Sequence, residues 1–475
     1  MAGRRELMYN FRGVYGRELT HSVAYLAGRQ AAAYYAEVSG KGDPKVIVGN
    51  DHRFSSNSLK HYLIQGLVSG GVVVRDVGLL PTSVLAFAVK KAADGGCMVT
   101  ASHNPPEYNG LKFFDSTGGV MKPATEDVIL AKVVKETAAG ATVQHVGSVT
   151  KNYGIVPTVS VINDYTKAVV GRVEVPVPLN VGLDCRFGTA FVIMPFLLKS
   201  LCCTYYPIHN ELNPYFLKSD GEYLSPEPTE ANIAEIAGLV RCGALDLGLV
   251  YDGDSDRNVV IDNKGEFIKD DIILLLLALE YSGDRRCVIT VDTSLMVERH
   301  LRDQGFELTV TPVGDPFVSS ALAEGKGSFG GVPNGHYIFP DFTPYSDGIY
   351  SSAVVLQIAS KLKTREMKLS DRIAELPPTH IRKTKVRFQR PQAEFEEDVA
   401  PALRDLMASY TDALDFRATD DTVVTGRSDD LKLLVRYNRW DNNFNVQAES
   451  LVSAAKADEL LGVLVEFLEA RSDRA

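Results

Sequence analysis

The residues best suited to chemistry lie in one stretch, Thr100-Ala-Ser-His-Asn-Pro-Pro-Glu-Tyr-Asn-Gly-Leu-Lys112. The mostly apolar residues 95–100 predict a short buried strand, and the prolines after Asn104 prevent that strand from continuing. Ser102 and His103 therefore follow the carboxyl end of a strand, where open α/β sheets bind their ligands. With the Lys112 amine they form a candidate catalytic site. The alternative is a polar turn with an N-capping serine.

A second stretch, Tyr251-Asp-Gly-Asp-Ser-Asp-Arg257, contains Asp252, Asp254 and Asp256 after another expected strand. In a tight loop this spacing turns three carboxylates toward one point, and they would repel one another without a hard cation. Three protein ligands leave positions open for a phosphate, which is how Mg²⁺ prefers to bind. A calcium EF-hand is excluded, because Arg257 and Asn263 stand where that loop needs Gly and Glu. A solvated acidic turn is the alternative.

Together, the serine stretch and the acidic loop indicate phosphoryl transfer. A serine hydroxyl beside Mg²⁺ either receives a phosphoryl group or carries one. Lys112 or a histidine would handle the proton of the substrate hydroxyl, and an arginine would stabilise the charge. No Gly-x-x-x-x-Gly-Lys-Ser/Thr sequence occurs, so a nucleotide P-loop is not supported.

The elements expected to position these loops repeat a pattern of alternating strands and helices. Expected strands lie at 45–49, 72–78, 95–100, 179–184, 245–251, 287–291 and 307–311. Expected helices lie at 18–38, 59–67, 83–91, 189–201, 271–279, 296–304 and 354–363. This alternation predicts parallel sheets joined by crossover helices.

The pattern changes after about residue 385. Strands are expected at 384–388, 422–425, 431–436 and 443–447, with helices at 393–409 and 453–471. This succession is typical of an antiparallel α+β domain. We therefore predict three α/β domains, at 1–152, 153–264 and 265–380, and a smaller fourth domain at 381–475.

Composition narrows the classes of function. The 475 residues are 45% hydrophobic and 23% charged, as in ordinary globular proteins, and the net charge of −10 argues against a nucleic-acid-binding surface. The run Ile272–Leu279 is too short to span a membrane, and the first residues lack the apolar core of a signal peptide. The six cysteines show neither metal-site nor disulfide spacing. We expect a cytoplasmic protein that binds neither nucleic acid nor a membrane.

The two candidate loops together resemble the α-D-phosphohexomutase family, the phosphoglucomutase and phosphomannomutase group. The resemblance covers essentially the whole chain. Besides the Ser102 stretch and the acidic loop, it rests on Phe11-Arg-Gly-Val-Tyr-Gly16, Leu80-Pro-Thr82, Pro226-Glu-Pro-Thr-Glu230, Gly330-Gly-Val-Pro-Asn-Gly-His336 and Ser346-Asp-Gly-Ile-Tyr350.

This resemblance implies four domains around a central cleft, with mixed, largely parallel sheets in the first three. In domain order, they would carry the phosphoserine loop, the metal-binding loop, the sugar-binding loop and the phosphate-binding loop. Ser102 would be the phosphoserine, and would bind Mg²⁺ together with Asp252, Asp254 and Asp256. A phosphoserine carries roughly −1.5 to −2 charge, which the cation must balance.

Further roles follow from the same resemblance. Arg257 would contact the phosphoserine or the substrate, and Lys112 and His103 would serve proton transfer and phosphate contact. The expected substrate-binding residues are Arg12, Asn334, His336, Arg436 and Arg439. For His336, a place in the core is the alternative.

Two substrate-holding loops depart from the family pattern, whereas the reaction loops keep it. Val332 stands where the family has a sugar-binding glutamate, so a charge-assisted hydrogen bond of roughly 1.5–3 kcal/mol is lost. Residues 436–442, Arg-Tyr-Asn-Arg-Trp-Asp-Asn, replace a turn rich in Ser, Thr and Gly. The hydroxyls and the glycine that let backbone amides hold a phosphate are therefore missing.

We expect a Mg²⁺-dependent mutase that moves a phosphoryl group between the 1- and 6-positions of glucose or mannose phosphate. It would act through a phosphoserine and a bisphosphate intermediate, with a sugar bisphosphate as activator. A mutase for a pentose or amino-sugar phosphate stays open. So do a weakly active or non-catalytic paralogue with a binding or regulatory role, and a phosphatase or kinase-like transferase. A phosphosugar is the expected partner, and a homodimer is compatible with the sequence.

Overall fold

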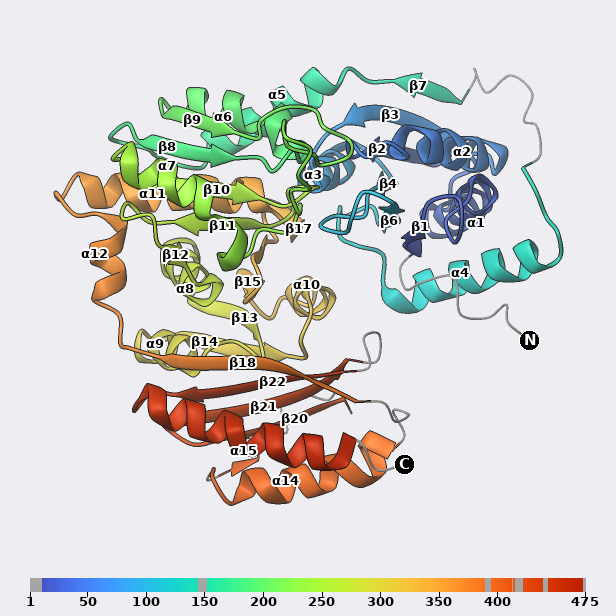
Figure 1. The fold of residues 1–475 in the computed structure, drawn as a ribbon. Coiled ribbons are helices and arrows are strands. Elements are labelled where there is room, and N and C mark those ends of the chain that lie inside the picture. Colours follow the sequence, from blue (N-terminus) through green and yellow to red (C-terminus); the bar gives the residue numbers. More distant parts are fainter. Residues whose placement is uncertain are drawn as a thin grey trace.

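Four five-stranded sheets and a two-stranded ribbon organise the described part of the chain, which comprises residues 11–143, 152–388, 394–411, 413–414, 422–438 and 443–472 of this computed structural model. Figure 1 shows the fourth sheet, with its helices, at the C-terminal end of the molecule and the other three gathered beside it. We refer to each sheet with its helices as a unit.

The first unit has the strand order β6-β4-β2-β3-β7, parallel except for the antiparallel edge strand β6. Its central strand is buried and β-branched, as expected for a parallel sheet covered on both faces. The strands are β2 (Lys45–Asn50), β3 (Val73–Leu79), β4 (Gly95–Val99), β6 (Leu111–Phe114) and β7 (Tyr153–Ile155). The helices are α1 (His21–Ser39), α2 (Ser56–Ser69), α3 (Thr82–Ala92) and α4 (Pro123–Ala138). The ribbon pairs β1 (Gly13–Val14) with β5 (Tyr108–Asn109).

The second unit has the strand order β12-β11-β10-β8-β9. Its strands are β8 (Asn180–Asp184), β9 (Thr204–Ile208), β10 (Leu247–Tyr251), β11 (Asn258–Ile261) and β12 (Phe267–Ile268), with helices α5 (Thr158–Val170), α6 (Met194–Ser200) and α7 (Ala234–Cys242). The single helix predicted at 189–201 is instead a 3₁₀ turn, Thr189–Val192, followed by α6. Pro195 explains the break, because it has no N–H to donate and is tolerated only in the first turn of a helix.

The third unit repeats the design, with the strand order β14-β13-β15-β16-β17. Its strands are β13 (Arg286–Thr290), β14 (Glu307–Thr311), β15 (Phe329–Val332), β16 (His336–Phe339) and β17 (Thr343–Ser346). Its helices are α8 (Asp270–Tyr281), α9 (Leu295–Asp303), α10 (Asp315–Ala323), α11 (Gly348–Lys363) and α12 (Leu369–Ala374). Most of α11 is buried, which fits its long run of small and aliphatic residues.

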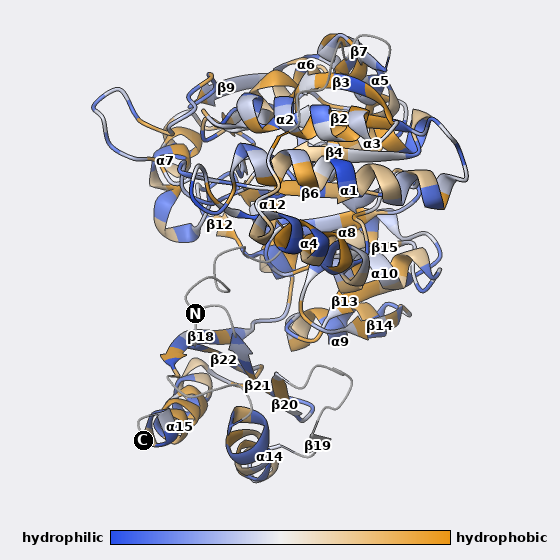
Figure 2. Ribbon diagram, turned by 90° about the vertical axis from the view of Figure 1, so that its right-hand side faces the viewer, coloured by the Kyte–Doolittle hydropathy of each residue, from blue (hydrophilic) through white to orange (hydrophobic). Residues whose placement is uncertain are grey.

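The fourth unit is an antiparallel sheet in the order β18-β22-β21-β20-β19. Its strands are β18 (His380–Arg387), β19 (Ala413–Leu414), β20 (Val423–Arg427), β21 (Leu431–Asn438) and β22 (Asn443–Ser450). Helices α14 (Ala400–Ala408) and α15 (Ala454–Ser472) cover one face, and a π-helical turn, Phe395–Val399, precedes α14. Figure 2 shows both hydrophilic and hydrophobic residues on these two helices.

Apolar packing divides the molecule unequally. One continuous cluster of buried side chains runs through the first three units, from Ile47 and Leu85 through Leu197 to Ile289 and Tyr350. The fourth unit has a separate core between its sheet and its helices. A small cluster of Val291, Val423 and Leu434 joins the third unit to the fourth.

The predicted fold class is confirmed: three similar α/β units with mixed sheets precede a C-terminal α+β unit. The domain boundaries stay a prediction. Strand β7 pairs with the first sheet although it lies past residue 152, and β12 pairs with the second sheet although it lies past residue 264. No helix among the described residues is long and apolar enough to cross a membrane.

Candidate active site

Ser102 lies three residues beyond the end of β4, in a backbone conformation that serine rarely adopts. Its φ of 52° is in the left-handed region. The buried Arg53 guanidinium holds the turn by donating to the carbonyl oxygens of Ser102 at 2.7 Å and Asn104 at 2.6 Å. It also donates to Pro105 and Tyr108, and its Nε lies 3.1 Å from Asp51 Oδ2. Arg53 therefore fixes the position of the serine.

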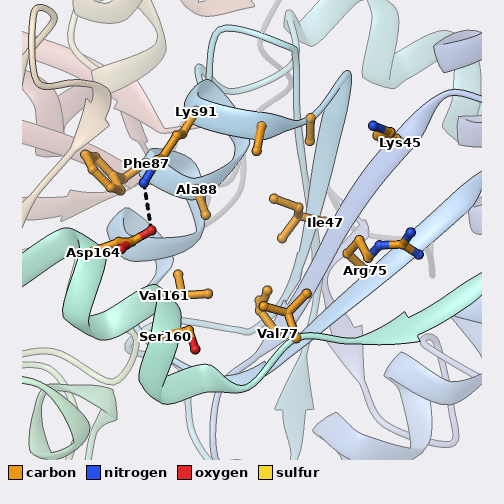
Figure 3. Close-up of a pocket in the computed structure, with 13 residues that line it drawn as sticks. Lys45, Ile47, Arg75, Val77, Phe87, Ala88, Lys91, Ser160, Val161 and Asp164 are labelled. Carbon is orange, nitrogen blue, oxygen red and sulfur yellow. Dashed lines mark hydrogen bonds and ion pairs between the residues drawn. The ribbon is translucent and has the colours of Figure 1, made fainter.

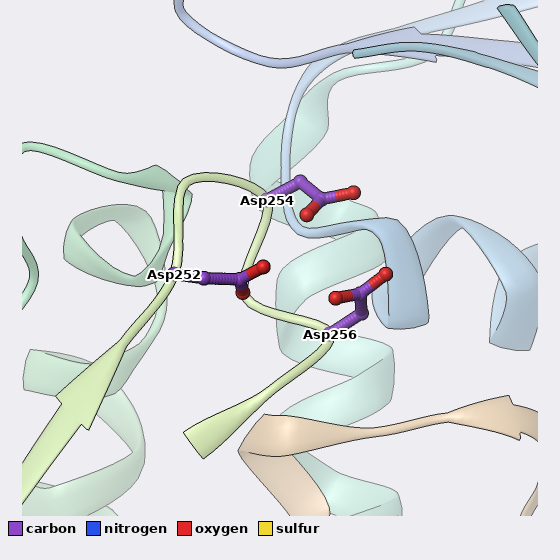
Figure 4. A group of neighbouring side chains, drawn as sticks. All are labelled: Asp252, Asp254 and Asp256. Carbon is purple, nitrogen blue, oxygen red and sulfur yellow. The ribbon is translucent and has the colours of Figure 1, made fainter. Parts of the chain in front are cut away.

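The acidic loop joins β10 to β11 and is completely shielded from solvent. Asp252, Asp254 and Asp256 are each at most 1% exposed, and one oxygen of each lies within 4.8 Å of the others. Figure 4 shows the three carboxylates on one side of the loop. Gly253 is required here, since a Cβ at this position would collide with the carbonyl of Ser102.

Both loops meet directly. Ser102 Oγ donates to Asp252 Oδ2 at 2.8 Å, and His103 Nδ1 lies 3.2 Å from the same Oγ. Lys112 Nζ, on β6, donates to Asp254 Oδ2 and to Asp256 Oδ2, each at 2.8 Å. The structure therefore brings the serine, the histidine, the lysine and all three aspartates into one site.

Residues from other segments complete the shell around the acids. Thr82 Oγ1, at the start of α3, donates to Asp254 Oδ2 at 2.6 Å. Tyr345, on β17, donates to Asp256 Oδ2 at 2.6 Å. Arg257 lies with its Nε 3.1 Å from Asp252 Oδ2. Each aspartate thus has its own set of donors.

The electrostatics of the loop are those of an acid cluster with incomplete compensation. Burial, with the charges of Asp256 and Asp254, raises the pKa of Asp252 to about 7, although Arg257 opposes the rise. Burial also raises the pKa of Asp256, but Lys112, His336 and Arg257 together hold it well below its usual range. Burial lowers the pKa of Lys112, yet Asp254 and Asp256 raise it further, so the group is a stable ammonium.

These residues fit a divalent metal ion. Oδ1 of Asp254 and Oδ1 of Asp256 are buried and accept no hydrogen bond from any described residue. Unpaired buried carboxylate oxygens are costly, and a hard cation with oxygen ligands removes that cost. With three carboxylates and few other protein ligands, the set suits Mg²⁺. Arg257 Nη2 is likewise buried without a partner among the described residues.

A cavity of about 200 Å³ opens beside the two loops. Its walls include Ser102, His103, Lys112 and Asp256 from the reaction loops, together with Arg12, Glu126, Asp315, His336 and Tyr345. Arg12 Nη1 lies 3.3 Å from Asn104 Oδ1, and His336 Nε2 lies 3.8 Å from Asp256 Oδ1. The cavity is therefore lined by the cationic groups of Arg12 and Lys112 as well as by carboxylates.

Not every predicted substrate-binding residue lies in this cavity. Asn334 is exposed, and its Oδ1 lies 2.9 Å from His336 Nδ1, so it contacts the cavity wall from outside. Arg436 lines a different cavity, on the C-terminal sheet. Arg439 lies outside the described residues. Val332 is 2% exposed and packs with Val288, Val318 and Ile338 in an apolar cluster.

Several residues of the site were not predicted from the sequence. Arg53, Thr82 and Tyr345 orient the reaction loops, and Glu126 and Asp315 add carboxylates to the cavity. Thr82 belongs to a quoted motif, so a signal existed for it. Glu126 lies in a helix that the strand-and-helix pattern did not reveal, and its role depends on burial. Burial, with the charge of Asp127, raises its pKa to about 7.

A larger cavity, of about 330 Å³, lies away from this site between the first sheet and helix α5. It is lined mainly by apolar side chains such as Ile47, Val77 and Val161, and the ion pair of Lys91 with Asp164 closes one edge at 2.7 Å (Figure 3). None of the predicted site residues lines it.

Comparison with known proteins identifies the relatives of the chain. The phosphoglucomutase/phosphomannomutase α/β/α domains I, II and III match residues 8–140, 163–265 and 269–380. A probable phosphoglucosamine mutase of Methanothermobacter thermautotrophicus is 34% identical over 378 residues, 79% of this chain and 80% of that protein. A phosphoglucomutase/phosphomannomutase of Thermococcus kodakarensis is 34% identical over 385 residues, covering 79% and 81%.

A solved structure of a Burkholderia thailandensis phosphoglucomutase/phosphomannomutase family protein shares the fold. It superposes with a TM-score of 0.81 and 24% identity, covering 98% of this chain and 97% of its own. The fold similarity therefore extends through the fourth unit.

Proposed function

Because the chain belongs to the phosphoglucomutase/phosphomannomutase family of intramolecular phosphotransferases, we propose that it is a Mg²⁺-dependent phosphosugar mutase with Ser102 as its phosphoryl carrier. One observation carries the proposal: Ser102 Oγ lies 2.8 Å from Asp252 within a buried cluster of three carboxylates. Burying three carboxylates next to a serine costs free energy, and nothing in the stability of the fold requires it. A functional role explains why they are there.

The acidic residues and the serine have distinct parts in this proposal. Asp252, Asp254 and Asp256 would hold Mg²⁺ together with Ser102. The bound metal would neutralise charge on the phosphoryl oxygens. Arg257, with its unpartnered Nη2, would add a fixed positive charge beside the same oxygens.

The transfer itself exchanges one phosphorus–oxygen bond for another. A hydroxyl oxygen of the sugar forms a bond to phosphorus as the bond from phosphorus to Ser102 Oγ breaks, and the hydroxyl proton passes to a base. His103, whose Nδ1 lies 3.2 Å from Oγ, is the candidate base for that proton, and the Lys112 ammonium would contact the phosphate and could return a proton as an acid in the reverse step. The bisphosphate so formed would turn in the cavity and return its other phosphoryl group to Ser102, so a trace of sugar bisphosphate would act as activator.

Hexose 1- and 6-phosphates of glucose or mannose are the proposed substrates. Other residues of the cavity would bind them, with Arg12 and His336 donating to phosphate or sugar oxygens and Asn334 holding the His336 ring. Arg436 lies on the C-terminal sheet, outside this cavity, so it would bind a substrate only from there. The role of Arg439 stays a prediction, because this residue lies outside the described residues.

A specific feature favours a second candidate, the 1- and 6-phosphates of a 2-amino sugar. The glutamate missing at Val332 is not replaced in that loop, but Glu126 and Asp315 place two carboxylates in the cavity. Carboxylates attract an ammonium group more strongly than a neutral hydroxyl. The Methanothermobacter relative is named a probable phosphoglucosamine mutase, which agrees with this candidate.

The test is turnover of single sugar phosphates by magnesium-loaded, phosphorylated protein. Glucose, mannose, glucosamine and ribose 1-phosphates are supplied separately with a trace of the matching bisphosphate. Formation of an isomer supports the mutase and identifies the substrate. Release of phosphate without an isomer would point to a phosphatase, and inactivity on every sugar would point to a non-catalytic paralogue.

Two variants locate the carrier. Ser102→Ala is expected to lower turnover by at least about three orders of magnitude, because it removes the hydroxyl that would carry the phosphoryl group. Ser116→Ala, at an exposed serine of the same unit, serves as control and should keep full activity. Retained turnover in Ser102→Ala would refute the assignment.

A further inference from the structure

The face of the first sheet that packs on α3 and α5 is not completely filled. Ile47 of β2 lies across from Arg75 of β3, and Val77 follows on the same face. Above them, helix α3 presents the small side chains of Ala88 and Ala92. Small side chains at a contact between a helix and a sheet leave space that larger aliphatic ones would fill. The result is the cavity of about 330 Å³ in Figure 3, which we call the α5 cavity.

The α5 cavity lies at the junction of the first two units and toward the other end of the sheet from Ser102. Lys45 begins β2 and Ala93 follows the last residue of α3, so the cavity is near the amino-terminal ends of the strands. Val161 and Asp164, on α5, belong to the second unit. No lining residue is shared with the cavity beside Ser102, so the two cavities are separate.

Most of the cavity wall is apolar. Ile47, Val77 and Val161 are buried, and Phe87 and Val156 are half-buried beside them. Ligand pockets are typically hollows of roughly 300–1,000 Å³ with apolar walls and a few polar groups that orient the ligand. The α5 cavity is therefore large enough, and apolar enough, to hold a small organic molecule.

Two cations on one side of the cavity have no carboxylate partner. Within the described part of the chain, no carboxylate oxygen lies within 4.0 Å of the Lys45 amine or of the Arg75 guanidinium, which donates only to the Val74 carbonyl, at 3.2 Å. Asp76, next to Arg75 in the sequence, points to the other face of the sheet, where it pairs with Lys60 at 2.8 Å. The charges of Lys45 and Arg75 are therefore left for solvent or for a ligand.

The third cation of the lining is already paired. Lys91 lies 2.7 Å from Asp164, the one carboxylate that lines the cavity among the described residues. Figure 3 shows this pair on one side of the cavity and Lys45 and Arg75 on the other. The cavity thus combines an apolar interior with an excess of positive charge at one side.

We propose that the α5 cavity binds a small carboxylate with an apolar body, such as a medium-chain fatty acid. The apolar body would fill the space between the sheet and α5, and the carboxylate would lie on the side of Lys45 and Arg75, where charge-assisted hydrogen bonds can form. A sugar phosphate fits this cavity poorly, because its hydroxyls would leave water for apolar walls. The site does not depend on the proposed function, since none of its residues takes part in phosphoryl transfer.

Binding is tested by calorimetric titration of the full chain with octanoate, and with octanol as an uncharged probe of the same length. The double variant Lys45→Gln, Arg75→Gln is expected to weaken octanoate binding about tenfold and to leave octanol binding unchanged, because only the carboxylate meets these charges. Ala88→Leu extends a side chain into the cavity and should weaken binding of both probes at least about tenfold. Lys132→Gln, at an exposed lysine of α4, is the control and should change neither.

Several results would overturn the proposal. Absent octanoate binding to the parent protein, or equal binding by all variants, would exclude the α5 cavity as the site. Equal losses of octanoate and octanol in the charge variant would show that the carboxylate is not recognised. A rise in KM for glucose 1-phosphate with octanoate that persists in Ala88→Leu would place octanoate in the cavity beside Ser102 instead. If the protein turned over no sugar phosphate, the proposed function would fail, and the titrations would still decide this site.

Discussion

Around Ser102, each side chain that could act on a phosphoryl group is held by at least one neighbour, although single oxygens of Asp254 and Asp256 stay unpaired: the serine by Asp252, the aspartates by Lys112, Thr82 and Tyr345, and the serine backbone by Arg53. On one face of the C-terminal sheet, by contrast, three cations (Lys383, Lys385 and Arg436) and the buried amide of Gln447 lack partners among the described residues. A reaction centre gains from donors and charges fixed before the substrate arrives. A ligand-holding surface leaves polar groups for the ligand to satisfy. The Ser102 site is therefore built to position reacting groups, and the face of the C-terminal sheet is built to supply affinity for a ligand.

The largest effect is expected from the pre-assembled side of this comparison, in Asp254→Asn. The variant keeps the shape of the loop but removes one of the three charges that favour a cation. We expect Mg²⁺ affinity to fall at least about 100-fold and turnover about 10³-fold. Calorimetry with Mg²⁺ and steady-state rates measure the two effects.

Asp220→Asn, at an exposed aspartate of the second unit, is the matched control and should change neither quantity. An unaltered Mg²⁺ affinity in Asp254→Asn would show that the acidic loop is not the metal site. The Ser102 region would then no longer be a pre-assembled metal-dependent site.

A smaller effect is expected from Arg53→Lys, which probes positioning rather than contact with substrate. Lysine keeps a charge near Asp51 but cannot reach four carbonyl groups with one planar fork. The serine turn should loosen, lowering kcat about 10- to 100-fold with KM changed less than about twofold. Steady-state kinetics give this split.

Arg29→Lys, at a half-buried arginine of α1 paired with Glu136, is the comparison variant. If Arg53→Lys instead raised KM and left kcat unchanged, Arg53 would bind substrate rather than position the serine, and its assignment to the pre-assembled site would be wrong.

The smallest effect concerns Glu126, whose carboxyl lies in the cavity without a cation of its own at ion-pair distance among the described residues. Its pKa in the fold is about 7, against 4.5 for the ordinary group. Since the folded value is the higher, its contribution to stability is complete below about pH 4.5 and is lost as the pH rises through 7. The loss is on the order of 3 kcal/mol.

Glu126→Gln removes this titration. Between pH 5 and pH 8 the parent protein should lose more stability than the variant, so the melting temperature of Glu126→Gln should rise relative to that of the parent. Thermal unfolding at both pH values measures this difference. Parallel melting curves at the two pH values would show that Glu126 ionises normally in the fold.

The residues predicted from the sequence are those whose chemistry is carried by a contiguous motif. Spacing along a loop determines which side chains lie close together, so the sequence identified Ser102, His103, Lys112 and the three aspartates. Arg53, Tyr345 and Glu126 could not, because each reaches the site from a distant segment and its role exists only in the folded chain. The fold class followed from alternating patterns, which reflect burial on sheet faces.

Local exceptions have local causes. The break at Pro195 replaced one predicted helix with two shorter elements, because proline overrides helical spacing. At Val332 the sequence revealed a substitution but not its structural setting. Its substitution for glutamate could be detected, but only the structure shows that this side chain is packed among Val288, Val318 and Ile338. A carboxylate restored there would be buried in an apolar cluster.

The acidic loop and its donors come from three units at once. The loop belongs to the second unit, Thr82 and Lys112 to the first, and Tyr345 to the third. A ligand that binds only the assembled arrangement stabilises every part that contributes to it. Together with the shared apolar core, these contacts link the first three units into one body, which a metal bound by the acidic loop would stabilise as a whole. The C-terminal unit has a core of its own and is tied to this body mainly through the third unit, by a small apolar cluster and the buried contacts of Glu449 and Lys432.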